Sequence, residues 1–198
     1  KDIVSVIIPK GITVIGESAF GNCTKLSNVD IATTVKTIGD MAFRQCSELT
    51  TVVIPEGIEV ISFESFAYCY ALTCVSIPES VKTIENNAFL KCPKLFEEEN
   101  GVTYVNNWAV DFNDSVTTVA LRENTIGIAN NTFNGSQKMR TITISDSVTS
   151  IGDSAFRSCT GLVSVTFGEN SQLSSIGVHA FWGCTGLVSV TFGENSQL

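Results

Sequence analysis

Cysteine is the residue type in this sequence whose spacing first suggests chemistry. Six of the seven cysteines recur at one position of a repeated segment, three residues after a phenylalanine. They are Cys23, Cys46, Cys69, Cys92, Cys159 and Cys184. A zinc site needs four ligands that converge at short spacings such as C-x-x-C, whereas this pattern supplies one thiol per repeat. The spacing therefore predicts packing roles, with no metal site and no cofactor.

The same cysteines could form disulfides, so their expected distances matter. We expect a helical turn at each cysteine, and stacked helical turns lie about 8–10 Å apart. A disulfide requires Cα atoms closer than about 7 Å. The pattern therefore predicts small buried thiols without disulfide partners. Cys74 is different, because it follows Leu72 by two residues and should lie on the outward face of a strand, where it could react.

Catalytic motifs are lacking in the sequence. A nucleophile usually needs a general base such as histidine, and the one histidine, His179, is expected on the outer surface. There is no phosphate-binding loop, no H-E-x-x-H and no G-x-S-x-G, and no carboxylate recurs at a convergent position. We therefore expect no enzyme activity and assign no catalytic residue.

Charge and hydropathy exclude further classes of partner. The formal net charge of -8 disfavours binding to nucleic acid, and lysine and arginine are scattered along the chain. No apolar run approaches the roughly 18 residues of a membrane span, so this segment should not insert into a membrane. Residues 1–9 lack the long apolar stretch of a signal peptide.

Seven phenylalanines organise the chain into repeats. Each closes a segment that resembles Ile-Gly-Asp-x-Ala-Phe, and the first four recur every 23 residues. These predicted structural core residues are Phe20, Phe43, Phe66, Phe89, Phe133, Phe156 and Phe181. Such a period is typical of stacked units, each of which needs its neighbours to bury its apolar face.

Each repeat has the same internal order. A strand with the pattern Leu-x-x-Val-x-Ile opens it, as at Leu49, Val52 and Ile54, and a proline such as Pro55 often follows. A second apolar pair comes next. The Ala-Phe-x-x-Cys segment then predicts one or two helical turns.

The period is interrupted once, at residues 96–115. Within this insert, two apolar segments flank Asn106-Asn107, which predicts a β-hairpin because asparagine tolerates the positive φ of tight turns. Its aromatic residues Tyr104, Trp108 and Phe112 are candidates for partner binding. In the alternative interpretation they cover the interrupted core.

The chain is expected to be a single solenoid over residues 1–198. A first repeat block spans residues 1–95, the insert spans 96–115, and a second block spans 116–198. The segment 159–173 is repeated letter for letter at 184–198, and the sequence stops within a unit. We expect a fragment of a longer array, truncated at its C-terminus.

Outward positions of the strands form a second candidate surface. They should make a ribbon rich in hydroxyl groups, since neighbouring strands lie about 4.8 Å apart. The candidate partner-binding residues here are Asn28, Asp30, Thr51, Ser76, Thr141, Thr143, Ser164 and Thr166. The alternative is a solvated sheet face without a partner.

The repeats, for example residues 49–69 with strand, proline, Ala-Phe and cysteine at fixed offsets, resemble the BspA-like leucine-rich repeats of bacterial and protist surface proteins. The resemblance implies an α/β repeat solenoid. We expect a right-handed leucine-rich-repeat-type superhelix of about eight coils, with a parallel strand ladder, short helical turns opposite and the β-hairpin insert.

The resemblance also implies a surface-exposed or secreted protein. We expect a noncatalytic protein-binding or adhesion module whose partners are host or neighbouring-cell proteins. The rival hypothesis is a structural spacer that displays another domain away from the cell surface. The sequence does not predict the oligomeric state.

Overall fold

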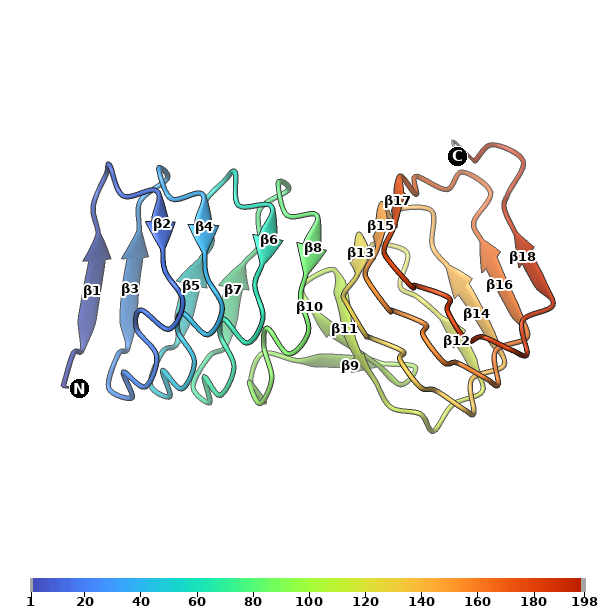
Figure 1. The fold of residues 1–198 in the computed structure, drawn as a ribbon, viewed down its shortest axis with the longest axis horizontal. Helices are drawn as coiled ribbons and strands as arrows, with labels where there is room; N and C mark the ends of the chain where they lie inside the picture. The colour runs from blue at the N-terminus through green and yellow to red at the C-terminus, as the bar shows by residue number, and fades with distance from the viewer. Residues whose placement is uncertain (1, 197–198) are drawn as a thin grey trace. The chain divides into compact units, whose positions relative to one another are not determined.

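The computed structural model describes residues 2–196, which form short strands joined by turns in a parallel β-solenoid of about eight turns. The chain divides into two compact units, Lys1–Phe96 and Glu97–Leu198 (Figure 1). We call them unit 1 and unit 2 and describe each by itself.

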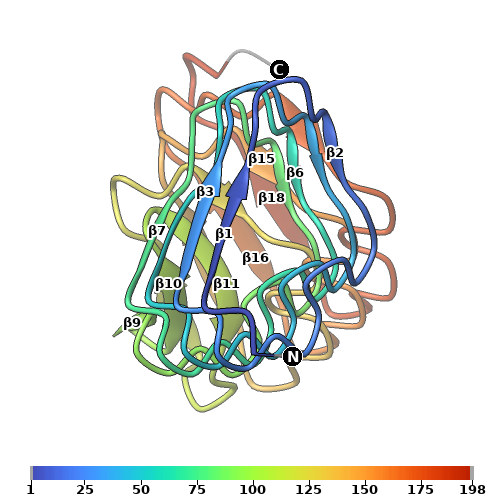
Figure 2. The same cartoon turned by 90° about the vertical axis from the view of Figure 1, so that its left-hand side faces the viewer.

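Unit 1 consists of two parallel strand ladders. In one ladder, β1 (Ser5–Ile8) pairs with β3 (Asn28–Ile31), and β5 (Thr51–Val53) pairs with β7 (Cys74–Ser76). In the other, β2 (Val14–Ile15) pairs with β4 (Thr37–Ile38), and β6 (Val60–Ile61) pairs with β8 (Thr83–Ile84). Equivalent repeat positions pair in register, so that Val6 lies opposite Val29 and Val52 opposite Val75. Figure 2 shows these coils one behind another.

Alternation along each strand explains why the coils stack. Val29, Val52 and Val75 are buried, and their neighbours on both sides in the strand are exposed or half-buried. Successive side chains of a strand point to opposite faces, so one apolar residue in two is enough to build the core. The Leu-x-x-Val-x-Ile pattern therefore specifies the inward face.

Unit 2 also has two ladders, and one of them begins with the insert. The first contains β12 (Thr118–Ala120), β14 (Thr141–Ile144), β16 (Ser164–Phe167) and β18 (Ser189–Thr191). The second contains β9 (Glu97–Glu99), β10 (Val102–Val105), β11 (Trp108–Phe112), β13 (Gly127–Ile128), β15 (Ser150–Ile151) and β17 (Ser175–Ile176).

The predicted β-hairpin is confirmed. Strands β10 and β11 pair antiparallel, and Asn106 in the turn between them has a φ of 51°. Strand β9 pairs antiparallel with β10, and β11 pairs parallel with β13. The hairpin thus changes the strand direction and then joins the parallel ladder.

The predicted helical turns are wrong, because no helix occurs among residues 2–196. In the first coil, the amides of Ser18 and Phe20 donate to the carbonyls of Asp40 and Ala42 in the next coil, at 2.9 and 2.8 Å. The amide of Ala19 between these positions donates within its own coil, to the carbonyl of Gly16 at 3.2 Å. Alternate amides therefore leave the coil, whereas an α-helix keeps all of them inside.

Backbone conformation accounts for this alternation. The residue two before each repeat phenylalanine has a positive φ, between 50° and 62°, in every coil. These residues are Ser18, Met41, Glu64, Asn87, Asn131, Ser154 and His179. A left-handed residue interrupts a right-handed helix, and the hydrogen bonds to the next coil compensate its steric cost of roughly 1–2 kcal/mol.

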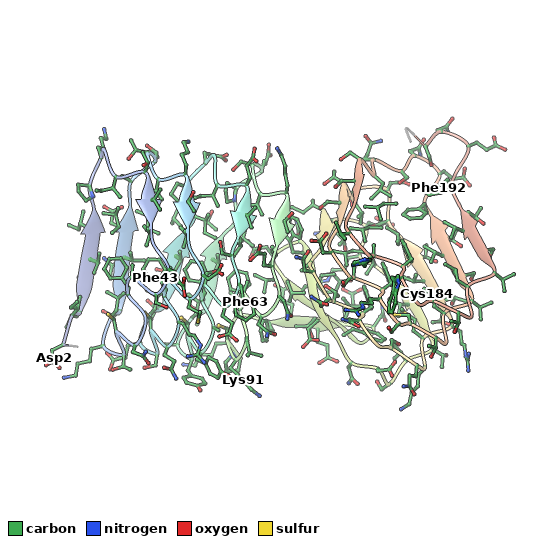
Figure 3. The ribbon with its side chains drawn as sticks, viewed as in Figure 1. Asp2, Phe43, Phe63, Lys91, Cys184 and Phe192 are labelled. Carbon is green, nitrogen blue, oxygen red and sulfur yellow. The ribbon has the colours of Figure 1, made fainter. Side chains whose placement is uncertain are left out.

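The repeat phenylalanines stack in the interior. In unit 1, the rings of Phe43 and Phe66 are 5.4 Å apart with an interplanar angle of 3°. In unit 2, Phe133 and Phe156 are 4.9 Å apart, also at 3°. Figure 3 shows Phe43 between the two ladders of unit 1. Rings this close require coils that are spaced like neighbouring strands, about 4.8 Å apart. Packed helices lie about 8–10 Å apart and would hold the rings too far from each other.

Candidate functional site

The outward face of the first ladder of unit 2 presents two rows of residues in register. One row is Thr118, Thr141, Ser164 and Ser189, and the other is Ala120, Thr143, Thr166 and Thr191. We call these eight positions the hydroxyl face. Thr141 and Ser164 are half-buried and the other six are exposed.

The ladder positions these side chains. The inward residues between the two rows, such as Ile142 and Val165, are fully buried in the core of unit 2. Because their packing fixes the register of each strand, the outward hydroxyl groups repeat at the strand spacing of about 4.8 Å. Thr118 and Ala120 were not among the predicted face residues, although the match of Val119 to the repeat pattern could have placed them there.

The equivalent face of unit 1 is chemically mixed. Its two rows are Ser5, Asn28, Thr51 and Cys74, and Ile7, Asp30, Val53 and Ser76. All eight are exposed, and the side chains of Ile7 and Val53 are 71% and 68% exposed. Cys74 lies on the outward face, as expected.

Burial decides the role of two hairpin aromatic residues. Tyr104 is 0% exposed and Trp108 is 2% exposed. Neither side chain offers a surface to a partner, so we do not retain them as binding candidates. The ring of Trp108 lies directly on Gly127, where an added methyl group would overlap it. Trp108 therefore covers the start of β13 within the core.

The third hairpin aromatic residue continues the phenylalanine stack. Phe112 is partly buried, and its ring lies 5.0 Å from that of Phe133 at an angle of 52°. In this way the insert supplies a neighbour for the first repeat phenylalanine of unit 2. The alternative interpretation, that the hairpin aromatics cover the core, agrees with this packing.

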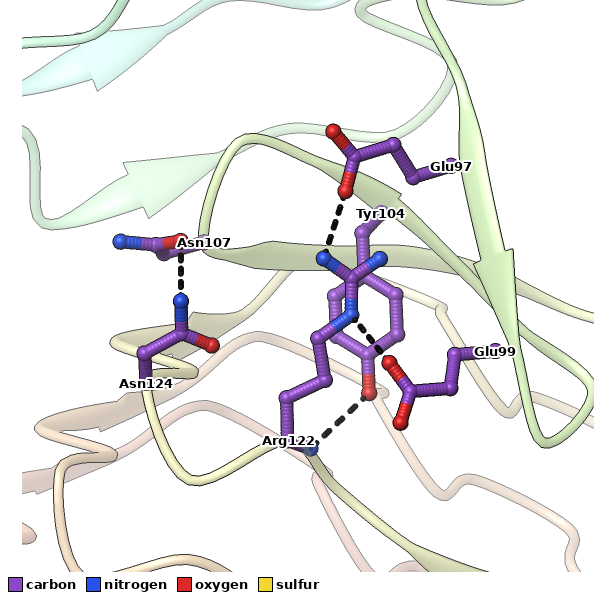
Figure 4. Close-up of polar contacts among 6 residues, drawn as sticks. All are labelled: Glu97, Glu99, Tyr104, Asn107, Arg122 and Asn124. Carbon is purple, nitrogen blue, oxygen red and sulfur yellow. Dashed lines mark hydrogen bonds and ion pairs between the residues drawn. The ribbon is translucent and has the colours of Figure 1, made fainter.

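Arg122 joins the hairpin to the strand before it (Figure 4). Its Nη1 lies 2.7 Å from Oε2 of Glu97, and its Nε lies 3.0 Å from Oε2 of Glu99. The guanidinium lies over the ring of Tyr104, with Cζ 3.9 Å from the centroid. Burial raises the pKa of Tyr104, although nearby Arg122 opposes the shift. The cluster fixes β9 to the hairpin.

Sequence reasoning missed two pairs of arginine with an aromatic ring. Arg44 lies 4.9 Å over Tyr68 in unit 1, and Arg157 lies 4.8 Å over Trp182 in unit 2. Trp182 and Tyr70 remain about half exposed. Trp182 directly follows the repeat phenylalanine Phe181, and Tyr70 directly follows the repeat cysteine Cys69. An aromatic residue next to these inward positions is the sequence signal that could have identified them as surface residues. Tryptophan, tyrosine and arginine dominate many protein interfaces.

The repeat cysteines donate hydrogen bonds between coils. The thiol of Cys69 lies 3.3 Å from the carbonyl oxygen of Phe43, and that of Cys159 lies 2.9 Å from the carbonyl oxygen of Phe133. Desolvation raises the pKa of Cys46 and of Cys159 to about 12. All seven cysteines are free thiols. The expected separation of about 8–10 Å between cysteine turns was wrong, however. The turns are not helical, and the coils are spaced like neighbouring strands, about 4.8 Å apart.

Neither metal binding nor a membrane span is indicated. Among the described residues, no three histidine, cysteine, aspartate or glutamate side chains are placed to hold a metal ion. Nor does any helix within residues 2–196 have the length and hydrophobicity to cross a membrane. His179 is exposed, as expected.

Comparison with solved structures gives matches at low identity, among them two that are described as leucine-rich repeat proteins. A protein from Eubacterium ventriosum is 22% identical over 98% of this chain, with a TM-score of 0.49, and the match spans 61% of that protein. The T. pallidum leucine rich repeat protein is 23% identical over 94% of this chain and 78% of its own, with a TM-score of 0.49. The pneumococcal vaccine antigen PcpA is 16% identical over 97% of this chain and 62% of its own, with a TM-score of 0.42.

Comparison with curated proteins gave no significant match. The family model described as "BspA type Leucine rich repeat region (6 copies)" matches residues 1–109 and 94–198. The repeated strand, turn and phenylalanine positions described above account for a match along the whole chain. The chain therefore belongs to the BspA-type leucine-rich repeat family.

Proposed function

We propose that this chain is a noncatalytic protein-binding or adhesion module of a cell-surface or secreted protein, and that its hydroxyl face contacts the partner. The observation that supports this most is the in-register arrangement of hydroxyl groups at seven of the eight outward positions on four neighbouring strands of unit 2. Extended strand faces are the surfaces that repeat proteins commonly use for binding. The partner would be a host or neighbouring-cell protein.

The chemistry of the face suits a polar partner surface. Threonine and serine hydroxyl groups both donate and accept hydrogen bonds, so they can pair with backbone or amide groups of another protein. The strands lose little entropy on binding because their register is fixed by the core. The surface location rests on the BspA-like resemblance of the repeats.

A second candidate function is a structural spacer, and one observation favours it. The hydroxyl face contains no tyrosine, tryptophan or arginine, and the aromatic residues Tyr104 and Trp108 are buried. Interfaces usually depend on such anchor residues for most of their binding energy. A spacer would hold another domain away from the cell surface and would need no partner of its own.

The test is capture of purified extracellular-matrix and plasma proteins by the immobilised chain. A Thr143→Lys, Thr166→Lys double variant places two long charged side chains on the hydroxyl face. Thr160→Lys, Thr185→Lys is the matched control, because both residues are exposed in turns of the same unit and the charge change is equal. Binding by the face predicts capture that the first variant loses and the second keeps.

Two other outcomes would change the proposal. Trp182→Ala would abolish capture if the partner instead docks on the Arg157–Trp182 pair. Absence of capture by a folded parent chain would contradict the binding hypothesis and favour the spacer. Circular dichroism of each variant distinguishes loss of binding from loss of fold.

A further inference from the structure

Asparagine is followed by glycine at two places in this chain, Asn100-Gly101 and Asn134-Gly135. In such a pair the backbone nitrogen of glycine can attack the asparagine side chain, because glycine has no side chain of its own to hinder the approach. Asn100 and Asn134 are both exposed. The two sites therefore share their sequence and their access to water, and they differ in the backbone around them.

Asn100 and Gly101 form the tight turn between β9 and β10. Their φ angles are 52° and 78°, and Glu99 lies opposite Val102. Positive φ at both central residues of a two-residue hairpin loop is typical of a type I′ turn. Within residues 2–196, neither the Gly101 amide nor the Asn100 side chain makes a hydrogen bond. The peptide group between the two residues can therefore turn over without the loss of a hydrogen bond.

Turning this peptide group over converts the turn to type II′, which hairpins also use. The first central residue keeps a φ of about +60°, and its ψ becomes about −120°. At that ψ the Gly101 nitrogen and the Asn100 Cβ lie on the same side of the Cα–C bond, as closure of a five-membered ring requires. The φ of Asn100 already has the required value, so β9 and β10 keep their pairing while the reactive geometry forms.

The second site, Asn134-Gly135, is held by hydrogen bonds. The Gly135 amide donates to the carbonyl of Arg157 in the next coil at 2.8 Å. The Asn134 Nδ2 donates to Oδ1 of Asn131 at 2.7 Å. The attacking nitrogen and the leaving amide group are both engaged, so reaction at Asn134 first requires local opening of the coil.

We propose that Asn100 is a site of spontaneous deamidation and that the fold protects Asn134 from the same reaction. The Gly101 nitrogen loses its proton and bonds to Cγ of Asn100. The Cγ–Nδ2 bond then breaks, and Nδ2 leaves as ammonia. Water opens the resulting succinimide at either carbonyl and produces aspartate or isoaspartate at position 100. One side-chain amide and one water become one carboxylic acid and one ammonia, and no electrons are transferred.

The product changes the hairpin in two ways. It adds a negative charge next to the three glutamates of β9, in a chain whose formal net charge is already -8. Isoaspartate also adds one carbon atom to the main chain, and a two-residue turn cannot take it up without a shift of the register between Glu99 and Val102. Strand β9 should then lose its contacts with Arg122. The inference does not rest on the proposed binding function.

The test is incubation of the folded chain in mildly alkaline buffer, with mass spectrometry of its peptides at intervals and detection of isoaspartate by isoaspartyl methyltransferase. We expect Asn100 to react at least about tenfold faster than Asn134, because Asn134 reacts only after local opening. The chain unfolded in urea is the control, and there the two sites should react at similar rates.

Three results would overturn the proposal. Equal rates at the two sites of the folded chain would show that the hydrogen bonds at Gly135 give no protection. An Asn100 that reacts in urea but not in the folded chain would show that the turn prevents ring closure. The same preference for Asn100 in urea would show that the sequence around each site, and not the fold, causes the difference.

A second measurement separates the longer main chain from the added charge. Hydrogen exchange at the amides of Glu99 and Val102 should be faster in the fraction that contains isoaspartate than in the parent chain. The Asn100→Asp variant carries the same charge on an unaltered main chain, and it should exchange like the parent. Equally fast exchange in Asn100→Asp would contradict the proposed effect of isoaspartate on the register.

Discussion

The outward strand faces of the two units differ in chemistry although their inward faces are nearly the same. In unit 2, seven of the eight outward positions carry hydroxyl groups, whereas the face of unit 1 includes Ile7, Asp30, Val53 and Cys74. Inward residues are constrained by the stack, because each must match the coil above and the coil below. Only the outward residues are free to differ between the units, so they are the residues that can determine which partner is bound.

The largest expected effect comes from an inward position. Phe66→Ala should destabilise the chain by roughly 3–5 kcal/mol, because it removes a fully buried ring stacked between Phe43 and Phe89. Urea unfolding measures the change. Thr51→Ala, at an exposed outward position, is the control and should be close to neutral. Equal stabilities of the two variants would break the distinction between inward and outward residues.

Alkaline pH should weaken the reduced chain through its buried thiols. The pKa of Cys46 and of Cys159 is raised to about 12 in the folded state, whereas an unfolded thiol has a pKa of about 8.5. The unfolded state therefore binds fewer protons above about pH 8.5, and stability falls from there until the folded pKa is reached. The loss should be about 2 kcal/mol per thiol between pH 8 and 10.

Denaturation at a series of pH values checks this dependence. The Cys46→Ala, Cys159→Ala double variant should be less stable at neutral pH and should lose less stability on going to pH 10. An unchanged pH slope in this variant would show that other groups cause the alkaline loss.

A smaller effect is expected where the hairpin meets the ladder. Gly127→Ala should destabilise unit 2 by roughly 1–3 kcal/mol, because the new methyl group overlaps the ring of Trp108. Gly16→Ala is the matched control, since no atom lies within 4 Å of the added methyl group there and its φ is not positive. A thermal melt of both variants tests the difference. A neutral Gly127→Ala would mean that Trp108 does not pack on β13.

The smallest effect on stability should come from the hydroxyl face itself. Thr143→Lys and Thr166→Lys should each change the free energy of unfolding by less than about 0.5 kcal/mol, because both residues are exposed. Urea unfolding is again the measurement. A large loss would indicate that these hydroxyl groups stabilise the strands, and the binding test would then need smaller substitutions.

The inward pattern was readable from the sequence because packing imposes it on residue type. The register of Val29, Val52 and Val75 and the hairpin at Asn106 follow from apolar spacing and turn chemistry. The backbone conformation at the phenylalanine turns could not be predicted from the sequence, because Met41 and Glu64 have no preference for the positive φ that they adopt. Hydrogen bonds to the next coil impose that conformation, and they depend on the stack as a whole.

The candidate site was only partly predictable for a related reason. Tyr104 and Trp108 have the residue types of an interface, but their burial depends on how β11 joins β13. Trp182 is exposed beside Arg157, and a repeat pattern assigns no role to that position. The cysteine distances were misjudged because they depend on turn geometry, which the helix prediction had wrong.

The most direct test of the central claim is the affinity of a captured partner for two lysine variants. The account predicts that Thr143→Lys, Thr166→Lys weakens binding by at least about tenfold, equivalent to about 1.4 kcal/mol, whereas Thr160→Lys, Thr185→Lys binds like the parent. Equal affinity of the two variants, or a loss confined to the turn variant, would contradict a binding role for the hydroxyl face.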